Sequence, residues 1–385
     1  MLGAAMLLVP WSVLSWNKLV GTVMPAASIR FRTDLFGVFV PPSPVLSIDA
    51  VLSGDFQREY AKLIGMRTPI YRTSVKLKNQ LLYSAFDTTD LPTLLIGRKH
   101  YLYEWVYVQE YCSRDLAQFE PQAAAWAPRI RQLQDWYESR GKTFLYVITP
   151  SKAAVYPQYF PKGYVCYAPA ADRDGLLPAW HHALDSAGVH YVDTAQITAA
   201  ARSKYPIELF PRGGTHWNRL AAALGTQAII DAIDTQKPAT LLQPLTFTWQ
   251  LSYKPLSPED DLLKLLNLMW PDRHYEVPLL HYAPPATSCR PARIAIIGGS
   301  FLHQIGEALL RSACPPQVDG WSYWKVFHIA WSNDTTLVLP LNKAERDRNV
   351  LQDANIVILE ENEVMVARSN HGPAFYDAVM GIPPL

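Results

Sequence analysis

Residues 294–310 constrain the fold of this chain more than any other stretch of its sequence. An apolar run at 294–297 is closed by two glycines and Ser300, and an amphipathic segment at 301–310 follows at once. A buried strand that turns sharply into a helix has this pattern, and such a turn presents a serine as a nucleophile. The same pattern also fits a tight turn in which Ser300 only caps the next helix.

A second short string offers a base for such a serine. Residues 212–218 read Arg-Gly-Gly-Thr-His-Trp-Asn, and a helical pattern at 218–232 follows directly. A serine nucleophile needs a neighbouring proton acceptor, which a histidine provides. We therefore expect His216 to lie within hydrogen-bond reach of Ser300. The alternative is a histidine that only packs at the edge of the core.

Strand and helix patterns alternate along most of the chain. Apolar runs typical of buried strands occur at 143–148, 190–192, 294–297, 325–329 and 356–359. Helical patterns lie between them, at 126–140, 177–187, 218–232 and 301–310. This order predicts an α/β protein with a parallel sheet and helices on both of its faces. Ligands of such sheets bind beyond the carboxyl ends of the strands.

Three segments divide the 385 residues. Residues 1–25 begin with an apolar stretch that suits a signal sequence or a membrane-anchor remnant, although a buried N-terminal helix is the alternative. Residues 26–90 form an extended and helical segment, and 91–385 form the α/β domain. The alternation lapses at about 244–285, where we expect an insertion or long loop.

Charge and cysteine content narrow the class of protein. Thirty-five basic and 34 acidic residues leave a net charge of +1, and no basic run or zinc-ligand spacing occurs, which argues against nucleic-acid binding. Four cysteines permit two disulfides in three pairings, or four buried thiols. A Cys289–Cys314 bridge would brace the turn that carries Ser300.

Together the two strings resemble the alginate O-acetyltransferase family of the AlgX and AlgJ type. The SGNH-hydrolase-like domain of that family carries Asp-x-His-Trp before Gly-Asp-Ser-Phe, similar to His216-Trp217 and Ser300-Phe301 here. Residues 95–103, 149–161 and 357–363 are also similar, and the resemblance covers roughly 50–380. It implies a three-layer α/β sandwich, permuted so that the histidine motif precedes the serine motif.

Two departures from the family pattern concern the aspartates. Gly214 stands where the family has its triad aspartate, and Gly299 stands where it has aspartate before serine. Loss of the orienting aspartate in a serine protease lowers the rate by about 10⁴. A main-chain carbonyl or a distant carboxylate must therefore hold the His216 ring. Asp193 and Glu361 follow strand patterns and are our candidates, although each also suits a structural role.

The resemblance implies acyl transfer in which Ser300 attacks an acetyl donor and His216 moves the proton. The main-chain N–H of Ser300 and a second donor would hold the oxyanion, with Gly299 and Asn333 as candidates. Aromatic rings stack on sugars, so Trp105, Trp321 and Trp324 are carbohydrate candidates. The main candidates for substrate binding are Lys152, Trp217, Asn218 and Trp331.

The resemblance also implies partners and a location. The acceptor would be an exported polysaccharide, and a membrane-bound acyltransferase would deliver the acyl group. No metal or nucleotide cofactor is implied. The protein would act in the periplasm or elsewhere outside the cytoplasm, with possible anchoring to the inner membrane through its N-terminus.

Two rival functions use the same fold. A catalytically silent polysaccharide-binding scaffold is favoured by the glycines at positions 214 and 299. An esterase would use the same Ser300 and His216 with water as the acceptor. The sequence does not separate an esterase from a transferase, because the difference lies in how well the site excludes water.

Overall fold

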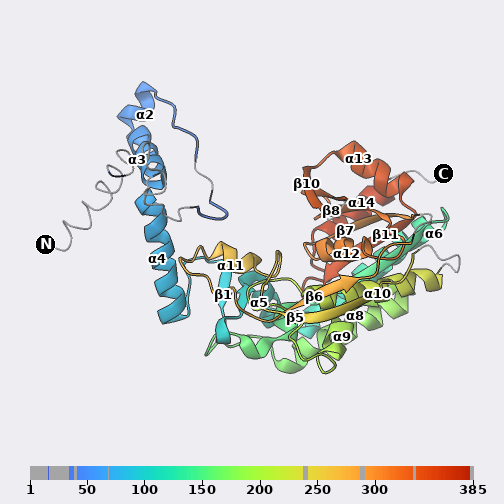
Figure 1. The fold of residues 1–385 in the computed structure, drawn as a ribbon. Coiled ribbons are helices and arrows are strands. Elements are labelled where there is room, and N and C mark those ends of the chain that lie inside the picture. The colour runs from blue at the N-terminus through green and yellow to red at the C-terminus, as the bar shows by residue number, and fades with distance from the viewer. Residues whose placement is uncertain are drawn as a thin grey trace. The chain divides into compact units, whose positions relative to one another are not determined.

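The computed structural model describes residues 16, 34–38, 41–67, 69–236, 242–286, 291–332 and 335–381. The chain divides into two compact units (Figure 1). One combines the described part of Met1–Pro92 with Leu262–Asp272, and the other combines Thr93–Asp261 with Arg273–Leu385. Apart from Trp16, the expected leader at 1–25 lies outside the described residues.

The first unit is helical. It contains α2 (Ile48–Leu52), α3 (Asp55–Arg67) and α4 (Pro69–Phe86). The Ser47 hydroxyl caps α2 by accepting the N–H of Ala50 at 3.2 Å. Helix α4 is hydrogen-bonded to the segment Leu262–Asp272, since Asn79 Nδ2 donates to the Leu266 carbonyl at 2.8 Å. Within the residues that the structure describes, no helix has both the length and the hydrophobicity needed to cross a membrane.

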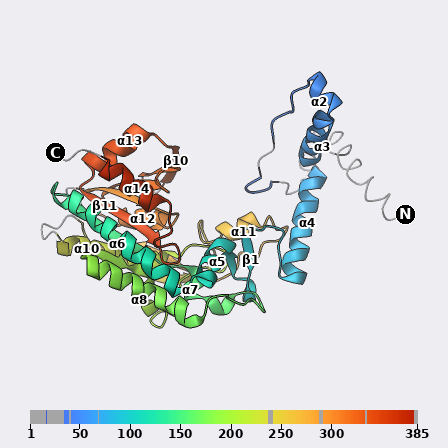
Figure 2. The ribbon, with the colours of Figure 1, turned by 180° about the vertical axis from the view of Figure 1, so that it is seen from behind.

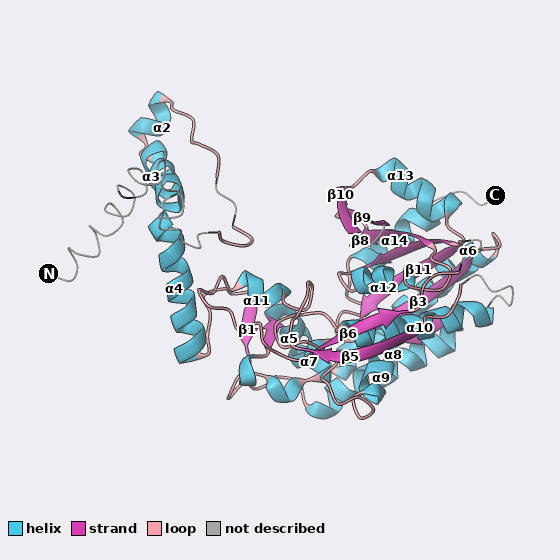
Figure 3. Cartoon of the chain, in the orientation of Figure 1, coloured by secondary structure: helices cyan, strands magenta, loops and turns pink. Residues whose placement is uncertain are grey.

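The second unit is built on a seven-stranded sheet with the order β10-β9-β8-β7-β11-β3-β4 (Figure 3). Its strands are β3 (Thr143–Thr149), β4 (Tyr191–Asp193), β7 (Arg293–Gly298), β8 (Gln317–Ser322), β9 (Phe327–Ser332), β10 (Thr335–Pro340) and β11 (Ile356–Asn362). The five strands from β8 to β4 are parallel, and the sequence analysis predicted four of them, β3, β4, β7 and β11, but missed β8. The run expected as a strand at 325–329 overlaps β9, which is antiparallel to β8, and β10 was missed. The short turn between β8 and β9 leaves no room for a crossover helix.

Helices cover both faces of this sheet, because its strands are apolar on both sides. Leu145 and Val147 of β3 pack with one layer, whereas Phe144 and Tyr146 pack with the other. The first layer contains α9 (Thr194–Ala201), α10 (Arg219–Gln236) and α12 (Leu302–Leu309). The second contains α6 (Leu116–Glu138), α8 (Ala170–Ala187) and α14 (His371–Met380), with α6 and α8 side by side in Figure 2.

Helices α6 and α8 begin seven or more residues before the starts that their sequence patterns indicate. Pro121 and Pro128 lie inside α6, and Pro178 lies inside α8. A proline disfavours a helix interior by about 3 kcal/mol. The buried face that each helix presents to the sheet outweighs this cost, and local pattern does not report that gain.

The remaining elements of this unit lie outside the seven-stranded sheet. They are β1 (Leu94–Ile96), β2 (Leu102–Glu104), α5 (Trp105–Ser113), α7 (Lys152–Val155), α13 (Lys343–Arg348), two 3₁₀ turns (Arg98–His100 and Pro157–Tyr159) and a π-helical turn (Asn349–Asp353). A disulfide joins Cys112 of α5 to Cys166. Cys314 is also disulfide-bonded, and Cys289 lies outside the described residues.

The expected insertion at 244–285 contains regular structure. Strands β5 (Phe247–Ser252) and β6 (Val277–Tyr282) pair as an antiparallel hairpin. The chain between them passes through α11 (Asp261–Leu265), which begins at Asp261. This segment brings a carboxylate to the site described next.

Candidate active site

The turn that carries Ser300 connects β7 to α12 and depends on a glycine. A Cβ atom at Gly298 would lie 2.4 Å from Glu360 Oε2 and 2.8 Å from Glu360 Cβ, so only glycine fits. Glu360 lies near the end of the neighbouring strand β11 and accepts the N–H of Gly299 at 2.7 Å. A buried carboxylate from the neighbouring strand therefore holds the turn in place.

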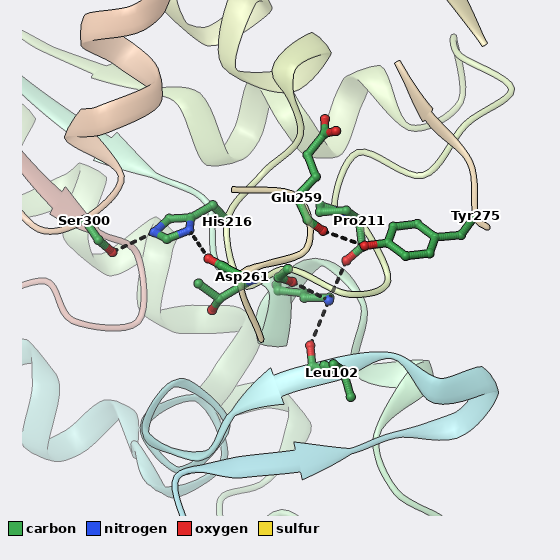
Figure 4. Close-up of polar contacts among 10 residues, drawn as sticks. Leu102, Pro211, His216, Glu259, Asp261, Tyr275 and Ser300 are labelled. Carbon is green, nitrogen blue, oxygen red and sulfur yellow. Dashed lines mark hydrogen bonds and ion pairs between the residues drawn. The ribbon is translucent and has the colours of Figure 1, made fainter. Parts of the chain in front are cut away.

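Ser300, His216 and Asp261 form a hydrogen-bonded chain (Figure 4). The distance from His216 Nε2 to Ser300 Oγ is 2.8 Å, and that from His216 Nδ1 to Asp261 Oδ2 is 2.9 Å. An ionised carboxylate only accepts, so the Nδ1 atom carries the ring proton and Nε2 accepts from the serine hydroxyl. Nucleophile, base and orienting carboxylate are thus arranged as in a serine hydrolase.

Asp261 reaches the histidine because the loop that carries it packs against a glycine. A Cβ atom at Gly214 would lie 2.9 Å from the carbonyl oxygens of both Pro258 and Glu259. The other carboxylate oxygen of Asp261 accepts the N–H of Thr215 at 3.0 Å. The absence of a side chain at Gly214 leaves room for the main chain of Pro258 and Glu259. The same segment carries Asp261, which lies against the His216 ring.

A buried lysine fixes the loop before the histidine. Lys152 Nζ donates to the carbonyls of Leu102, Pro211 and Gly214 at 2.7 Å each, and to that of Arg212 at 3.2 Å (Figure 4). Burial lowers the pKa of this ammonium well below its usual range, although Asp261 opposes the shift. Lys152 was expected to bind substrate, but its charge is taken up by main-chain carbonyls.

Tyr275 and Arg219 contact the segment around Glu259. The Tyr275 hydroxyl donates to the Glu259 carbonyl at 2.8 Å (Figure 4). The Glu259 carboxyl is buried 3.7 Å from an Arg219 nitrogen. Burial raises its pKa to about 7, and Arg219 opposes this shift. The loop that carries Asp261 therefore contains a carboxyl group that titrates near neutrality.

Two tyrosines lie beside the serine. Burial raises the pKa of Tyr107 well above its ordinary value, and burial also raises the pKa of Tyr323, so both hydroxyls stay protonated at neutral pH. The Tyr323 hydroxyl interacts with the Ser300 hydroxyl and with its main-chain N–H. Tyr323 occupies a left-handed backbone position, with φ 49°, in the turn after β8. A protonated hydroxyl therefore lies beside Ser300.

Other titratable groups shape the charge of the site. Burial lowers the pKa of His303 to about 4, with a further contribution from His216, so His303 is neutral at pH 7. Burial raises the pKa of Glu104, whereas His216 lowers it. In the described part of the chain, no cluster of three or more His, Cys, Asp or Glu side chains is arranged to hold a metal ion.

Asp193 and Glu361, the carboxylates that the sequence suggested as partners of His216, bind other residues in the structure. Asp193 Oδ2 instead lies 2.7 Å from His181 Nε2, and its other oxygen caps α9. Glu361 is buried and accepts from the Tyr146 hydroxyl at 2.6 Å. Neither residue contacts the His216 ring. Asp193 is bound to His181 of α8 and to the start of α9, and Glu361 is bound to Tyr146 of β3.

Other candidates lie in the packing around the site. Gly299 gives its N–H to Glu360, which leaves it no free donor for an oxyanion. Asn333 lies outside the described residues. Asn218 is buried and caps α10 by accepting the N–H of Ala221 at 3.0 Å. Of the tryptophans proposed for carbohydrate, Trp105 is 42% exposed; the buried ones are Trp217, Trp321, Trp324 and Trp331.

Asp261 was missed by the sequence analysis, and the signal for it was weak. Glu259, Asp260 and Asp261 form an acidic run inside the insertion. An acidic run in a long loop is normally a solvated surface, and nothing local selects one of its three carboxylates. Tyr107 and Tyr323 carried no local signal either.

Comparison with known proteins places this chain in a family. The family described as an SGNH hydrolase-like domain, acetyltransferase AlgX, matches residues 102–301. This match covers more than half of the chain and includes His216, Asp261 and Ser300.

The chain belongs to this family.

Individual relatives are distant. The probable alginate O-acetylase AlgJ of Pseudomonas putida is 26% identical over 151 residues, which span 38% of this chain and 35% of that protein. The matched stretch is thus about a third of the length of this AlgX-family relative. The solved O-acetyltransferase domain of Pseudomonas putida AlgJ is 20% identical with a TM-score of 0.48, covering 76% of this chain and 100% of that one. Pseudomonas aeruginosa AlgX is 13% identical with a TM-score of 0.47, covering 74% and 67%.

Proposed function

We propose that this protein is an O-acetyltransferase that moves an acetyl group through Ser300 to a hydroxyl of a polysaccharide. Its membership of the AlgX acetyltransferase family supports the reaction class. The observation that carries the proposal is the hydrogen-bonded chain from Ser300 through His216 to Asp261. The scaffold alternative rested mainly on the glycine at position 214. Asp261 supplies a carboxylate to His216 in its place, which favours the enzyme over the scaffold.

In the first half of the reaction, Ser300 Oγ attacks the carbonyl carbon of the acetyl donor and gives its proton to His216 Nε2. The negative charge on the carbonyl oxygen is held by the main-chain N–H of Ser300 and the hydroxyl of Tyr323. Asp261 stabilises the imidazolium that forms at His216. The bond to the leaving group then breaks, the leaving group takes the proton from His216, and acetyl-Ser300 remains.

The second half reverses these roles. A sugar hydroxyl gives its proton to His216 Nε2 while its oxygen attacks the acetyl carbon of acetyl-Ser300. The tetrahedral adduct uses the same oxyanion donors, and it collapses to the sugar acetate when Ser300 recovers its proton from His216. The order of histidine before serine in the chain corresponds to a permuted arrangement of the SGNH type.

We also propose that the protein works outside the cytoplasm on an exported polysaccharide and receives its acyl group through a membrane-bound acyltransferase. The Cys112–Cys166 disulfide supports an oxidising compartment.

The test is an acylation assay with an activated acetyl ester and mass spectrometry of the intact protein. The wild type should gain one acetyl group, mapped to Ser300, and release the leaving group in a burst. Ser300→Ala should abolish the label, and His216→Ala should slow labelling by at least about 10³. Equal ester cleavage by wild type and Ser300→Ala would overturn the proposal and favour the scaffold.

A second measurement separates transferase from esterase. Once acetyl-Ser300 has formed, an oligosaccharide acceptor should gain the acetyl group in preference to water. If hydrolysis proceeds at the same rate with and without acceptor, and no acetylated sugar is detected, the esterase is the better description.

A further inference from the structure

An open cleft of about 700 Å³ lies on the flank of α12, beside the insertion. Its walls are formed by α10, by β6 of the insertion hairpin, by α12 and by the edge of β9. Arg219 and Gln304, which line it, follow His216 and Ser300 by three and four residues in the sequence, at the starts of α10 and α12. The proposed chemistry does not use this cleft.

The cleft contains polar groups that lack partners. Gln304 is only 3% exposed, and neither of its amide atoms has a hydrogen-bond partner in the described structure. The indole N–H of Trp331, on β9, is also buried and has no hydrogen-bond partner among the residues that the structure describes. Buried donors and acceptors are costly to leave unsatisfied, so their persistence at the wall of a cleft points to a ligand.

The other lining groups indicate the chemistry of that ligand. Tyr282 lines the cleft together with Arg219, Glu307 and Arg311. The lining therefore offers charges of both signs, an amide and an aromatic ring. Because the lining carries both positive and negative side chains, it does not favour a ligand with one strong charge. A saccharide suits it, because each hydroxyl both donates and accepts and each sugar ring has an apolar face.

We infer that this cleft binds the polysaccharide acceptor and that Gln304 and Trp331 hydrogen-bond to its hydroxyls. The inference rests on the proposed acetyl transfer, because it names the acceptor site of that reaction. The insertion would then serve two purposes. It delivers Asp261 to the catalytic histidine, and its hairpin forms one wall of the acceptor cleft.

The experiment measures binding of two probes, a β-1,4-linked glucose hexasaccharide and a β-1,4-linked uronic acid hexasaccharide, to the full chain carrying Ser300→Ala. Calorimetry should detect at least one of them. Adding Gln304→Leu should weaken binding about tenfold, the loss expected for one hydrogen bond to a buried group. Trp331→Phe, which keeps an aromatic ring but removes the donor, should act in the same direction.

Gln118→Leu is the matched control, because Gln118 is exposed on α6 and does not line the cleft. Gln304→Leu removes an amide without partners, so its melting temperature should equal or exceed that of the parent protein. A melting temperature that falls would assign Gln304 a structural role and overturn the inference.

The remaining outcomes keep this inference apart from the proposed function. If neither hexasaccharide binds, or if Gln304→Leu and Gln118→Leu bind equally, the cleft is not the acceptor site and a protein partner becomes the better occupant. Normal acylation of Ser300 would still support the enzyme in that case. Conversely, binding that depends on Gln304 in a protein that never acylates would support the cleft and reject the transferase.

Discussion

The two halves of the catalytic arrangement are built in different ways. Ser300 stands on a turn between adjacent elements, β7 and α12, and its geometry follows from a few neighbouring residues. Asp261 comes from an insertion, 45 residues after the histidine that it orients. Its position depends on how one loop packs on another. The serine half is therefore a local property of the chain, and the carboxylate half is a property of tertiary packing.

This difference shows how a carboxylate can reach His216 although position 214 is a glycine. Gly214 removes the expected carboxylate and also makes room for the main chain of Pro258 and Glu259. Lys152 and Tyr275 then hold the two segments that meet there. Gly214 thus lacks the expected carboxylate but packs against the segment that carries Asp261.

The largest expected effect comes from breaking the carboxylate half directly. Asp261→Asn should lower the rate of Ser300 acylation by about 10⁴, or roughly 5 kcal/mol of barrier, because the amide no longer holds the reactive tautomer of His216. Pre-steady-state acylation measures this rate. Asp193→Asn is the control, since Asp193 contacts His181 in the same manner outside the site. A loss in Asp261→Asn no greater than in that control would separate Asp261 from catalysis.

Removing the buried ammonium should come next. Lys152→Met leaves four main-chain carbonyls without their shared donor and should lower the free energy of unfolding by about 4 kcal/mol. Lys142→Met is the control, because Lys142 donates to two carbonyls from a half-exposed position. Denaturant unfolding gives both values. Equal losses would mean that Lys152 does not stabilise the histidine loop in particular.

The pH dependence of stability tests the loop that carries Asp261. The folded pKa of Glu259 is about 7 against an ordinary 4.5, so folding favours its protonated form. The resulting stabilisation is complete below pH 4.5 and is lost as pH rises through 7. Relative to Glu259→Gln, the wild type should lose up to roughly 3 kcal/mol across this window. Glu120→Gln, on the exposed face of α6, should leave the wild-type profile unchanged.

The smallest expected effect compares two glycines. Gly214→Ala places a methyl group 2.9 Å from two carbonyl oxygens and should destabilise the protein by about 2 kcal/mol. Gly299→Ala meets nothing closer than 3.6 Å and should cost less than half as much. Thermal unfolding of the two variants gives the difference. Similar losses would show that the close approach at Gly214 is easily relaxed.

Much of the fold follows from local patterns. The alternation of apolar runs with amphipathic segments predicts four of the five parallel strands, β3, β4, β7 and β11, and the helices that cover them. Strand β8 was missed, because Asp319 and Gly320 interrupt its apolar pattern. The antiparallel direction of β9 was not predicted, and β10 was missed because most of it is exposed. The hairpin in the insertion was missed for a related reason, since β5 and β6 are only partly buried.

The sequence by itself indicated Ser300 as the nucleophile and His216 as its base, because each residue stands in a short string that resembles a motif of the family. The tertiary structure alone decided which carboxylate orients the histidine. Asp193, Glu361 and Asp261 are chemically equivalent, and only packing separates them. Two are bound elsewhere, whereas the third approaches through the space left by Gly214. A carboxylate acts over a few ångströms, and distances of that kind between remote segments are set by the whole fold.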